Sequence, residues 1–346
     1  MAVADGQQGA FQRARYPVAL LSLSLLLALT WSVGYLLTPA PLPPDKTATV
    51  VIPKGSGLKN TTTLLAGASL IGGGIGERWS FLVLATLSRR ARRLPAGEFA
   101  LSGGQRPLVL LNALAAAKPL SHAITLPEGL TAAEMADILA RDGWCDKTEY
   151  LSLMIDATFI GKQGFTGLAS LEGYLYPDTY HLTRAESGAG HLIAMQARRF
   201  KEVWKELGGD RLNAAAQRQT VILASLVEKE TALAAERPLV AGVFANRLRL
   251  GMPLQSDPSV LYGVTNAPRP ITRADLERST PYNTYVIAGL PVGPIANPGR
   301  ESLAAALNPA PTDFLYFVAK NDGSHQFSTT LDDHNAAVRQ YQRRGK

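Results

Sequence analysis

The sequence of 346 residues contains a single cysteine, Cys145. One thiol excludes an internal disulfide and offers no cluster for zinc or for an iron–sulfur centre, so Cys145 is best read as a small core residue. The five histidines do not show H-E-x-x-H or similar ligand spacing, and we expect no catalytic metal. A G-x-S-x-G nucleophile elbow and a local cysteine-protease signature are also missing.

Motifs for nucleotides and nucleic acids are equally scarce. The glycine-rich segment 72–76 lacks the Gly-Lys-Ser/Thr ending of a phosphate loop and the spacing of a dinucleotide site, so no nucleotide cofactor is expected. The net charge of +7 and the pI near 9.5 suit an anionic surface such as a bilayer or an anionic polymer, and would also suit nucleic acid. The densest basic run, 89–93, has no interleaved aromatic residues, and a solvated helix end accounts for it equally well. We therefore expect no nucleic-acid partner.

One long hydrophobic run stands near the N-terminus. Pro17 to Leu37 carries no charge over 21 residues, and roughly 20 apolar residues cross a bilayer as a helix. Arg13 and Arg15 precede the run, which favours a cytoplasmic segment 1–16 and places the bulk of the chain outside. A cleaved signal peptide is the alternative. The run is longer than a normal signal core and segment 37–41 is a poor cleavage site, so we predict an uncleaved single-pass anchor in the cytoplasmic (inner) membrane, with the rest periplasmic.

The remainder predicts an α+β architecture. Residues 38–46 are rich in proline and form a stiff spacer. Two similar units follow, in which a short β-branched strand, a Pro-x-Gly turn and an amphipathic helix succeed one another at 49–70 and 123–140; Thr131 and Glu134 give the second helix a capping box. Such units resemble LysM-like glycan-binding modules, and a generic βα packing unit is the alternative. We assign 47–145 to a LysM-like region and 146–346 to a mixed α+β catalytic domain.

Two smaller patterns lie within the second part. Polar helical sequence between 186 and 218 includes a helix that closes at the paired glycines Gly208 and Gly209. Near the C-terminus, the apolar run 314–319 and the segment 325–328 predict a hairpin of two strands, followed by a helix through Gln340.

The stretch Val221–Thr231 places two carboxylates, Glu228 and Glu230, at the end of a hydrophobic helix. Residues two apart on a helix point about 200° apart, so only one of the pair can enter a given cleft. Glu230 lies in the row of Leu223, Leu226 and Val227, which is the more apolar of the two rows. A carboxyl group held against apolar neighbours favours its neutral form and can act as a general acid near neutral pH. A solvated helix end with ion-paired acids is the alternative.

The downstream sequence argues against that alternative. Residues 241–248, 251–263, 282–285 and 289–298 are dense in Gly, Pro, Asn, Asp, Gln and Tyr. This composition is typical of shaped loops that present hydrogen-bonding side chains and flat rings, as a saccharide site requires.

These motifs together resemble one family. The sequence is similar to the YceG-like family of endolytic murein transglycosylases from about residue 46 to near the C-terminus, and several motifs agree in order and spacing. The resemblance is carried by LEGYLYPDTY at 171–180, LASLVEKET at 223–231, VFANRLRLGMPLQSDPSVLYG at 243–263, YNTY at 282–285 and GLPVGPIANPG at 289–299.

The resemblance implies a reaction and its residues. By it, the second acid of V-E-K-E-T, Glu230, is catalytic, and the enzyme cleaves the bond between N-acetylmuramic acid and N-acetylglucosamine within peptidoglycan strands. The products carry 1,6-anhydro ends, and cleavage terminates or releases nascent strands; no cofactor is implied. Glu172 is a further residue that either faces the cleft or forms a turn. The candidates for positioning the sugars are Glu228, Gln255, Asp257, Tyr262, Asn283 and Tyr285.

Two other functions stay open. A non-catalytic wall-binding scaffold for peptidoglycan synthases requires the LysM-like region but not Glu230. A muramidase that hydrolyses the same bond requires a second carboxylate. Asp257 is placed to be that group, although an aspartate before Pro258 is also a common turn former, and we favour the turn or substrate-orienting role. The expected partners are peptidoglycan strands and the cytoplasmic membrane, with peptidoglycan synthases as further candidates.

Overall fold

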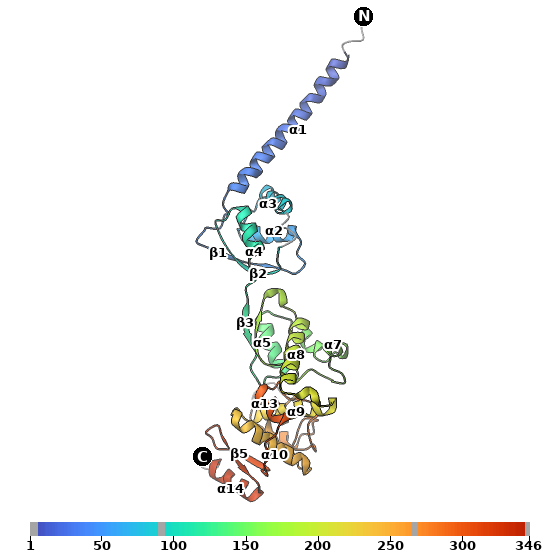
Figure 1. Ribbon diagram of the computed structural model, residues 1–346, viewed down its shortest axis with the longest axis vertical. Coiled ribbons are helices and arrows are strands. Elements are labelled where there is room, and N and C mark those ends of the chain that lie inside the picture. The colour runs from blue at the N-terminus through green and yellow to red at the C-terminus, as the bar shows by residue number, and fades with distance from the viewer. Residues whose placement is uncertain (1–5, 89–93, 265–268, 343–346) are drawn as a thin grey trace. The chain divides into compact units, whose positions relative to one another are not determined.

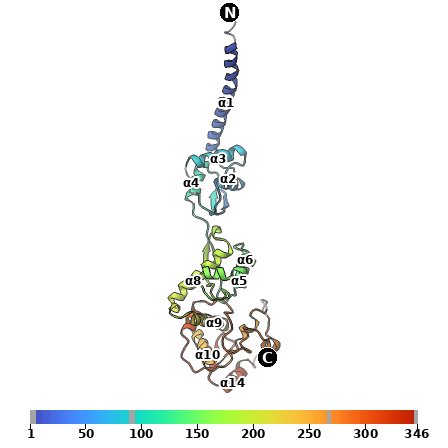
Figure 2. The same ribbon diagram turned by 90° about the vertical axis from the view of Figure 1, so that its right-hand side faces the viewer.

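The computed structural model describes residues 6–88, 94–264 and 269–342. The chain divides into two compact units, of which the first is Met1–His122 with Leu182–Ala185 and the second is Ala123–His181 with Glu186–Lys346. Small two-stranded sheets and many helices make up both (Figures 1 and 2). The predicted α+β class is therefore confirmed.

The first unit begins with one long helix, α1, which runs from Gly6 to Leu37 (Figure 1). Its segment Leu20–Leu37 is long and apolar enough to cross a membrane, and only 6% of that segment is buried within the protein. The helix includes the predicted span 17–37 and starts earlier than that span. Leucines along this segment, such as Leu20, Leu25 and Leu29, are exposed.

A β-α-α-β arrangement follows α1. Strand β1 (Thr47–Ile52) pairs antiparallel with β2 (Gly97–Ser102), so that Thr47 lies opposite Ser102. Helices α2 (Leu58–Gly67) and α3 (Ile75–Leu87) lie between the strands in sequence, and α4 (Pro107–Ala116) follows them. The glycine-rich segment 72–76 joins α2 to α3. The predicted strand–turn–helix pattern is thus present at 47–67.

Alternation along the two strands builds the core of this unit. Inward-facing residues of β1 and β2 alternate with outward-facing ones, as the pleat of a strand requires. The buried side chains are Val50, Ile52, Leu65, Leu70, Ile71, Phe81, Ala85, Phe99, Leu101, Leu110, Leu111 and Leu114.

The second unit opens with the other strand–turn–helix pattern. Strand β3 (His122–Thr125) leads to α5 (Ala132–Arg141) and pairs with β4 (Thr179–Leu182). The predicted capping box is present, because the Thr131 hydroxyl accepts from the Glu134 N–H (3.2 Å) and the Glu134 carboxylate accepts from the Thr131 N–H (2.8 Å). The two similar patterns therefore lie in different compact units, and the division falls at 122/123, whereas the sequence suggested a domain boundary at 145/146.

Helix α9 (Ala214–Glu230) is the central helix of the second unit, and α10, α11 and α13 all pack against it. Every side chain from Val221 to Val227 is buried. The surrounding helices are α6 (Lys147–Leu153), α7 (Ala157–Lys162), α8 (Ala189–Glu206), α10 (Arg237–Arg249), α11 (Asp257–Leu261), α12 (Arg273–Glu277) and α13 (Arg300–Leu307). Short 3-10 turns cover Arg184–Glu186, Gly209–Arg211 and Ala234–Glu236.

Both smaller predictions for this unit are confirmed. Helix α8 ends just before Gly208, whose φ of 79° is a left-handed conformation that glycine adopts without steric cost. The C-terminal hairpin consists of β5 (Tyr316–Ala319) and β6 (His325–Ser328), paired antiparallel, and α14 (Leu331–Tyr341) follows. Cys145 is a free, half-buried thiol, and burial raises its pKa to about 11.

Candidate functional site

Helix α9 delivers the two acids of the V-E-K-E-T motif. The helix starts at an N-cap, where the Asn213 side chain accepts from the Ala216 N–H (3.0 Å), and it ends where Thr231 turns to extended backbone. Glu228 and Glu230 are therefore held at the C-terminal end of a helix that is packed into the core. The two carboxylates meet different partners.

The carboxyl group of Glu230 receives a hydrogen bond from the hydroxyl of Ser256. Burial is the main cause that raises the pKa of Glu230 to about 7; the charge of Asp257 acts in the same direction, whereas the Ser256 hydrogen bond and Arg247 act against it. The residue as a whole stays partly exposed. A carboxyl group in this state is protonated in a large fraction of molecules at neutral pH and is still reachable by a ligand.

Asp257 and Tyr285 form a pair beside Glu230. The Tyr285 hydroxyl donates to Oδ1 of Asp257 (2.5 Å), and Asp257 is exposed at the first position of α11. Burial raises the pKa of Tyr285, and the charges of Asp257 and Glu230 raise it further. Tyr285 is therefore a neutral hydrogen-bond donor at any working pH. The structure thus brings three of the predicted site residues together.

Arg247 of α10 fixes the loop that carries Ser256. Its guanidinium, in a residue that is only 7% exposed, donates to the carbonyls of Leu315 (2.7 Å) and Leu254 (2.9 Å) and approaches the side-chain oxygen of Gln255 (3.5 Å). Arg247 was not among the site residues predicted from the sequence. The available signal was a charged residue on a helix whose neighbours at 243 and 244 are apolar.

Gln255 lies between Arg247 and Ser256 in an unusual conformation. Its side chain is exposed and its φ of 51° lies in the left-handed region, which a residue with a Cβ adopts only at a cost. The backbone is held there because the Gln255 N–H donates to the carbonyl of Thr284 (3.1 Å) and the Ser256 N–H donates to the Thr284 hydroxyl (2.8 Å). Strained residues of this kind cluster at functional sites.

Glu228 forms hydrogen bonds within the protein through both of its carboxylate oxygens. Its Oε1 accepts from Arg237 (3.2 Å) and its Oε2 accepts from the Gly299 N–H (2.9 Å), and its side chain is 5% exposed. Glu128 also approaches Arg237, at 3.5 Å. Both oxygens of Glu228 are therefore occupied by the protein, and no part of this contact set is directed at a ligand.

Asn283 is likewise committed to the fold. It is fully buried, its amide nitrogen donates to the carbonyls of Asp275, Leu276 and Arg278, and its amide oxygen accepts from the Tyr285 N–H (3.0 Å). The side chain thus shapes the loop that presents Tyr285 rather than reaching a sugar itself.

Tyr262 belongs to a second cluster, around Glu172. The Tyr262 hydroxyl (3.0 Å) and the Asn297 amide (2.8 Å) both donate to the Glu172 carboxyl group, which also accepts from the Ala132 N–H (3.0 Å). Burial raises the pKa of Glu172 to about 7. The Tyr262 ring packs on Tyr282 with centroids 4.6 Å apart. Glu172 therefore joins three segments of the second unit.

Asn297 completes that cluster, although it was not among the individual site residues predicted from the sequence. Its side-chain oxygen accepts from the N–H groups of Gly173 (2.9 Å) and Leu175 (3.0 Å), and its amide nitrogen also donates to the carbonyl of Leu130 (3.0 Å). An asparagine within I-A-N-P is thus the hydrogen-bonding link between the motif at 289–299 and the motif at 171–180.

Within residues 6–88, 94–264 and 269–342, no group of three or more His, Cys, Asp and Glu side chains is arranged to hold a metal ion. His325 instead pairs with Glu236 through Nδ1 (2.6 Å). The chemistry that this arrangement offers is that of one partly exposed carboxyl group with a pKa near neutrality, beside an acid–tyrosine pair.

Comparison with known proteins gives a consistent result. The model of the YceG-like family matches residues 50–340. A protein of Bacillus subtilis named endolytic murein transglycosylase is 37% identical over 234 residues, which cover 63% of this chain and 64% of that protein. A Streptococcus pneumoniae protein with the same name is 29% identical over 363 aligned residues, which cover 93% of this chain and 64% of that protein.

A solved structure agrees with these relatives. The crystal structure of a YceG-like protein from Listeria monocytogenes is similar with a TM-score of 0.56 and 30% identity, covering 84% of this chain and 99% of that one. The chain spans just under two thirds of the length of the curated relatives described above. Since the family model covers most of the sequence in a single match, this protein belongs to the YceG-like family.

Proposed function

We propose that this protein is a membrane-anchored, endolytic lytic transglycosylase of peptidoglycan. The observation that carries the proposal is the state of Glu230, a carboxyl group with a pKa raised to about 7 by burial and still partly exposed at the end of α9. A single residue that must first donate and then accept a proton works best when its pKa lies near the working pH. The name that the curated relatives share supports the same activity.

The reaction needs one acid and no water. Glu230 donates its proton to the glycosidic oxygen between N-acetylmuramic acid and N-acetylglucosamine, and the bond from that oxygen to C1 of the muramic residue breaks. The resulting carboxylate then takes the proton of the muramic C6 hydroxyl, while the C6 oxygen forms its bond to C1. The products are a 1,6-anhydro end and a new N-acetylglucosamine end, and Glu230 is protonated again.

The neighbouring pair supports this assignment of roles. Asp257 accepts from Tyr285 and is exposed, so its negative charge is placed to stabilise the oxocarbenium-like transition state or to orient the sugar. Gln255 lies two residues before Asp257 in the sequence, and its side chain is exposed. Glu228 and Asn283 hold the framework, and Tyr262 acts through Glu172, so we assign these three to positioning and not to direct contact with substrate.

The proposal also covers the N-terminal part. The apolar helix α1 supports a single-pass anchor in the cytoplasmic membrane, with residues 1–16 cytoplasmic and the remainder periplasmic. The antiparallel β-α-α-β arrangement at 47–102 supports a LysM-like, glycan-binding role within the region 47–145. An anchored enzyme of this kind would cut strands near the membrane, beside the synthases that make them, and so end their growth.

Mass spectrometry of digested glycan strands tests the proposal. The full-length chain, incubated with isolated sacculi, is expected to give anhydro ends, which are lighter than hydrated ends by one water. Glu230→Gln should give neither product, because the amide is nearly isosteric and cannot cycle a proton. Glu149→Gln, an exposed acid on α6, is the matched control. Hydrated reducing ends would make the protein a muramidase, and no cleavage by the wild-type chain would favour a scaffold.

A further inference from the structure

The exposed face of α3 in the first unit is apolar. Four of its side chains lie at intervals of four residues along the helix: Ile75 (73% exposed), Trp79 (60%), Val83 (48%) and Leu87 (78%). Residues at this spacing occupy one side of a helix. The opposite side, with Phe81 and Ala85, is buried in the core. The helix is therefore apolar on both its inner and its outer face.

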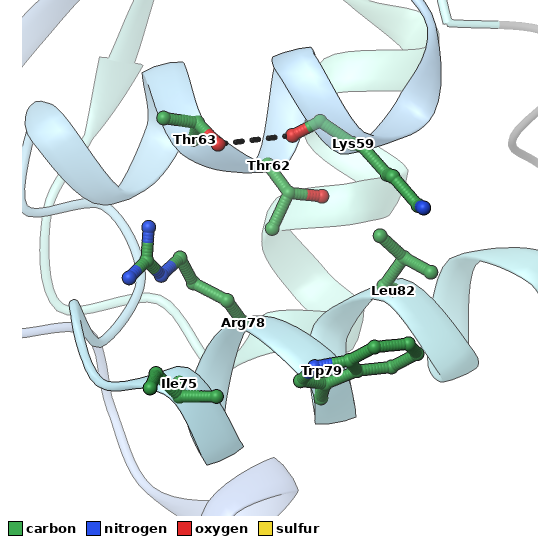
Figure 3. A pocket seen from close by; sticks show the side chains of 7 residues that line it. All are labelled: Lys59, Thr62, Thr63, Ile75, Arg78, Trp79 and Leu82. Carbon is green, nitrogen blue, oxygen red and sulfur yellow. Dashed lines mark hydrogen bonds between the residues drawn. The ribbon is translucent and has the colours of Figure 1, made fainter.

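The charged residues of α3, Glu77 and Arg78, are only partly exposed. Glu77 turns back to the start of the helix, where its carboxylate accepts from the Gly74 N–H (2.8 Å). Arg78 lies over the groove between α2 and α3 (Figure 3). A helix on the surface of a water-soluble protein normally carries charged or polar side chains on its outer face. A row of large apolar side chains instead marks an interaction surface.

The start of α3 packs against the last turns of α1. The Ser80 hydroxyl donates to the Ser32 hydroxyl (3.1 Å), and the Trp31 ring lies so close to Gly76 that a Cβ at that position would approach it to 2.5 Å. Trp31 and Ser32 belong to the apolar segment Leu20–Leu37. Because Trp31 stacks on Tyr35 (centroids 6.1 Å apart), two aromatic rings mark the end of this segment, as at a membrane–water interface.

Cationic groups border the same face. A groove of about 250 Å³ between α2 and α3 is lined by Lys59 and Arg78, together with Thr62, Thr63, Ile75, Trp79 and Leu82 (Figure 3). In sequence, four arginines follow between residues 89 and 93. An apolar stripe bordered by lysine and arginine is the composition of helices that lie in the interface of an anionic bilayer.

We propose that α3 is a second membrane contact, an interfacial helix whose side chains Ile75, Trp79, Val83 and Leu87 insert into the surface of an anionic phospholipid bilayer. Lys59 and Arg78 face the headgroup phosphates. The proposal rests on the anchoring role proposed for α1, because the contact of α3 with the end of α1 is what brings this face to the membrane. The two contacts together fix the orientation of the first unit on the bilayer.

Quenching of tryptophan fluorescence by lipids with brominated acyl chains tests this contact. The full-length chain is reconstituted into nanodiscs of phosphatidylcholine alone or mixed with phosphatidylglycerol, and the variants Trp79→Phe, Trp31→Phe and Trp204→Phe are compared. Trp204 is buried in the second unit and serves as the control. We expect Trp79→Phe and Trp31→Phe each to remove part of the lipid-dependent quenching, and Trp204→Phe to remove none.

A second set of variants tests the stripe and the charges with Trp79 in place. Ile75→Ser combined with Leu87→Ser should reduce the quenching of Trp79, and the exposure of both side chains leaves the core intact. Arg78→Glu should reduce it in discs that contain phosphatidylglycerol and much less in phosphatidylcholine alone.

The quenching results distinguish failure of the membrane contact of α3 from failure of the membrane anchor α1. If Trp31 is quenched and Trp79→Phe leaves the quenching unchanged, the interfacial helix is refuted while the anchor stands. If the chain fails to enter discs and neither tryptophan is quenched, both are refuted. Equal quenching of Trp79 in the two lipid mixtures would refute the preference for anionic lipid.

Discussion

Ser256 donates its hydroxyl hydrogen to Oε1 of Glu230 and thereby joins the residue before α11 to the last residue of α9, 26 positions earlier in the chain. This hydrogen bond favours the ionised carboxylate, whereas burial favours the neutral acid. Burial prevails, and the pKa settles at about 7. The contact therefore limits a shift that desolvation alone would make larger.

Ser256→Ala should raise the pKa of Glu230 further, since it removes a donor to the ionised form. The descending alkaline limb of the pH–rate profile should then move to higher pH, because the acid form persists longer. Ser259→Ala is the control, since Ser259 bonds the carbonyl of Ser256 and the hydroxyl of Thr284 but not Glu230. The limb is measured with isolated sacculi as substrate. A shift to lower pH, or the same shift in both variants, would contradict this role.

Glu230→Gln should change the pH dependence of stability. The pKa of Glu230 in the folded protein, about 7, lies above its ordinary value of 4.5. The folded state thus holds this proton more tightly than the unfolded state, so the stabilisation is complete below pH 4 and is lost as pH rises through 7. The shift from 4.5 to about 7 corresponds to about 1.4 kcal/mol per unit of pKa, so Glu230→Gln should gain on the order of 3 kcal/mol relative to wild type between pH 4 and pH 8.

Thermal or denaturant unfolding of the two proteins across pH 4 to 8 measures this difference, together with a pH–rate curve for the wild type. A stability difference that stays constant with pH, combined with a flat alkaline limb, would show that Glu230 is an ordinary solvated carboxylate and that the acid lies elsewhere.

Substitutions of Glu228 should act through stability. Glu228→Ala removes the nearer carboxylate from Arg237, whose side chain is 8% exposed, and leaves the more distant Glu128; we expect a loss of about 3 kcal/mol. Arg237→Ala should cost a similar amount, and the double variant less than the sum. Denaturant unfolding of the three variants gives the coupling free energy between Glu228 and Arg237.

The two acids should also differ in their effect on activity. Turnover per folded molecule should fall less in Glu228→Gln than in Glu230→Gln. A stable but inactive Glu228→Gln, beside an active Glu230→Gln, would reverse the assignment of the two acids.

Two substitutions of Gln255 should distinguish the energetic cost of its backbone conformation from the contribution of its side-chain amide. Gln255→Gly relieves the left-handed φ of 51° and should stabilise the protein by up to about 1 kcal/mol relative to Gln255→Ala, which keeps the strain. Both variants lose the amide and should lose turnover to a similar extent if that amide orients a sugar. Unfolding free energies and steady-state rates are measured for the pair. Wild-type turnover in both variants would show that the Gln255 amide has no role in the site.

The topology of the anchor gives a further test. The uncharged run 17–37 and the arginines before it predict that residues beyond about 40 lie outside the cytoplasm. Protease added to spheroplasts should therefore digest the second unit, while a cytoplasmic marker protein survives. Protection of that unit would overturn the orientation, and a mature N-terminus near residue 40 would show a cleaved signal peptide.

The burial of α9 does not distinguish Glu230 from Glu228, although the sequence predicts that the row of Glu230 is the more apolar one. The row of Glu228, which includes Val221 and Ser225, is as deeply buried as the row of Glu230, because α10, α11 and α13 surround α9. The more apolar stripe therefore does not distinguish the two acids. Their partners do, since Arg237 neutralises Glu228, whereas Glu230 meets a serine hydroxyl and lies near the negative charge of Asp257.

The sequence by itself determined what depends on neighbours along the chain. The apolar helix near the N-terminus, the capping box at Thr131, the end of α8 before Gly208 and the C-terminal hairpin follow from local periodicity, side-chain capping and glycine conformation, and short-range sequence encodes all of these. The family could also be predicted from the sequence, because several of its motifs occur in this chain in the same order, and the family model confirms that prediction.

Only the tertiary structure decided how the candidate site residues are used. The partners of Glu228 and Glu230 come from 9, 26 and 71 residues away, namely Arg237, Ser256 and Gly299. Asn283 is a further example. Its polar side chain is of a type that suits a sugar site, but in the structure its amide nitrogen donates to backbone carbonyls. A pKa depends on desolvation and on charges within a few ångströms, and those distances are set by packing between segments remote in sequence.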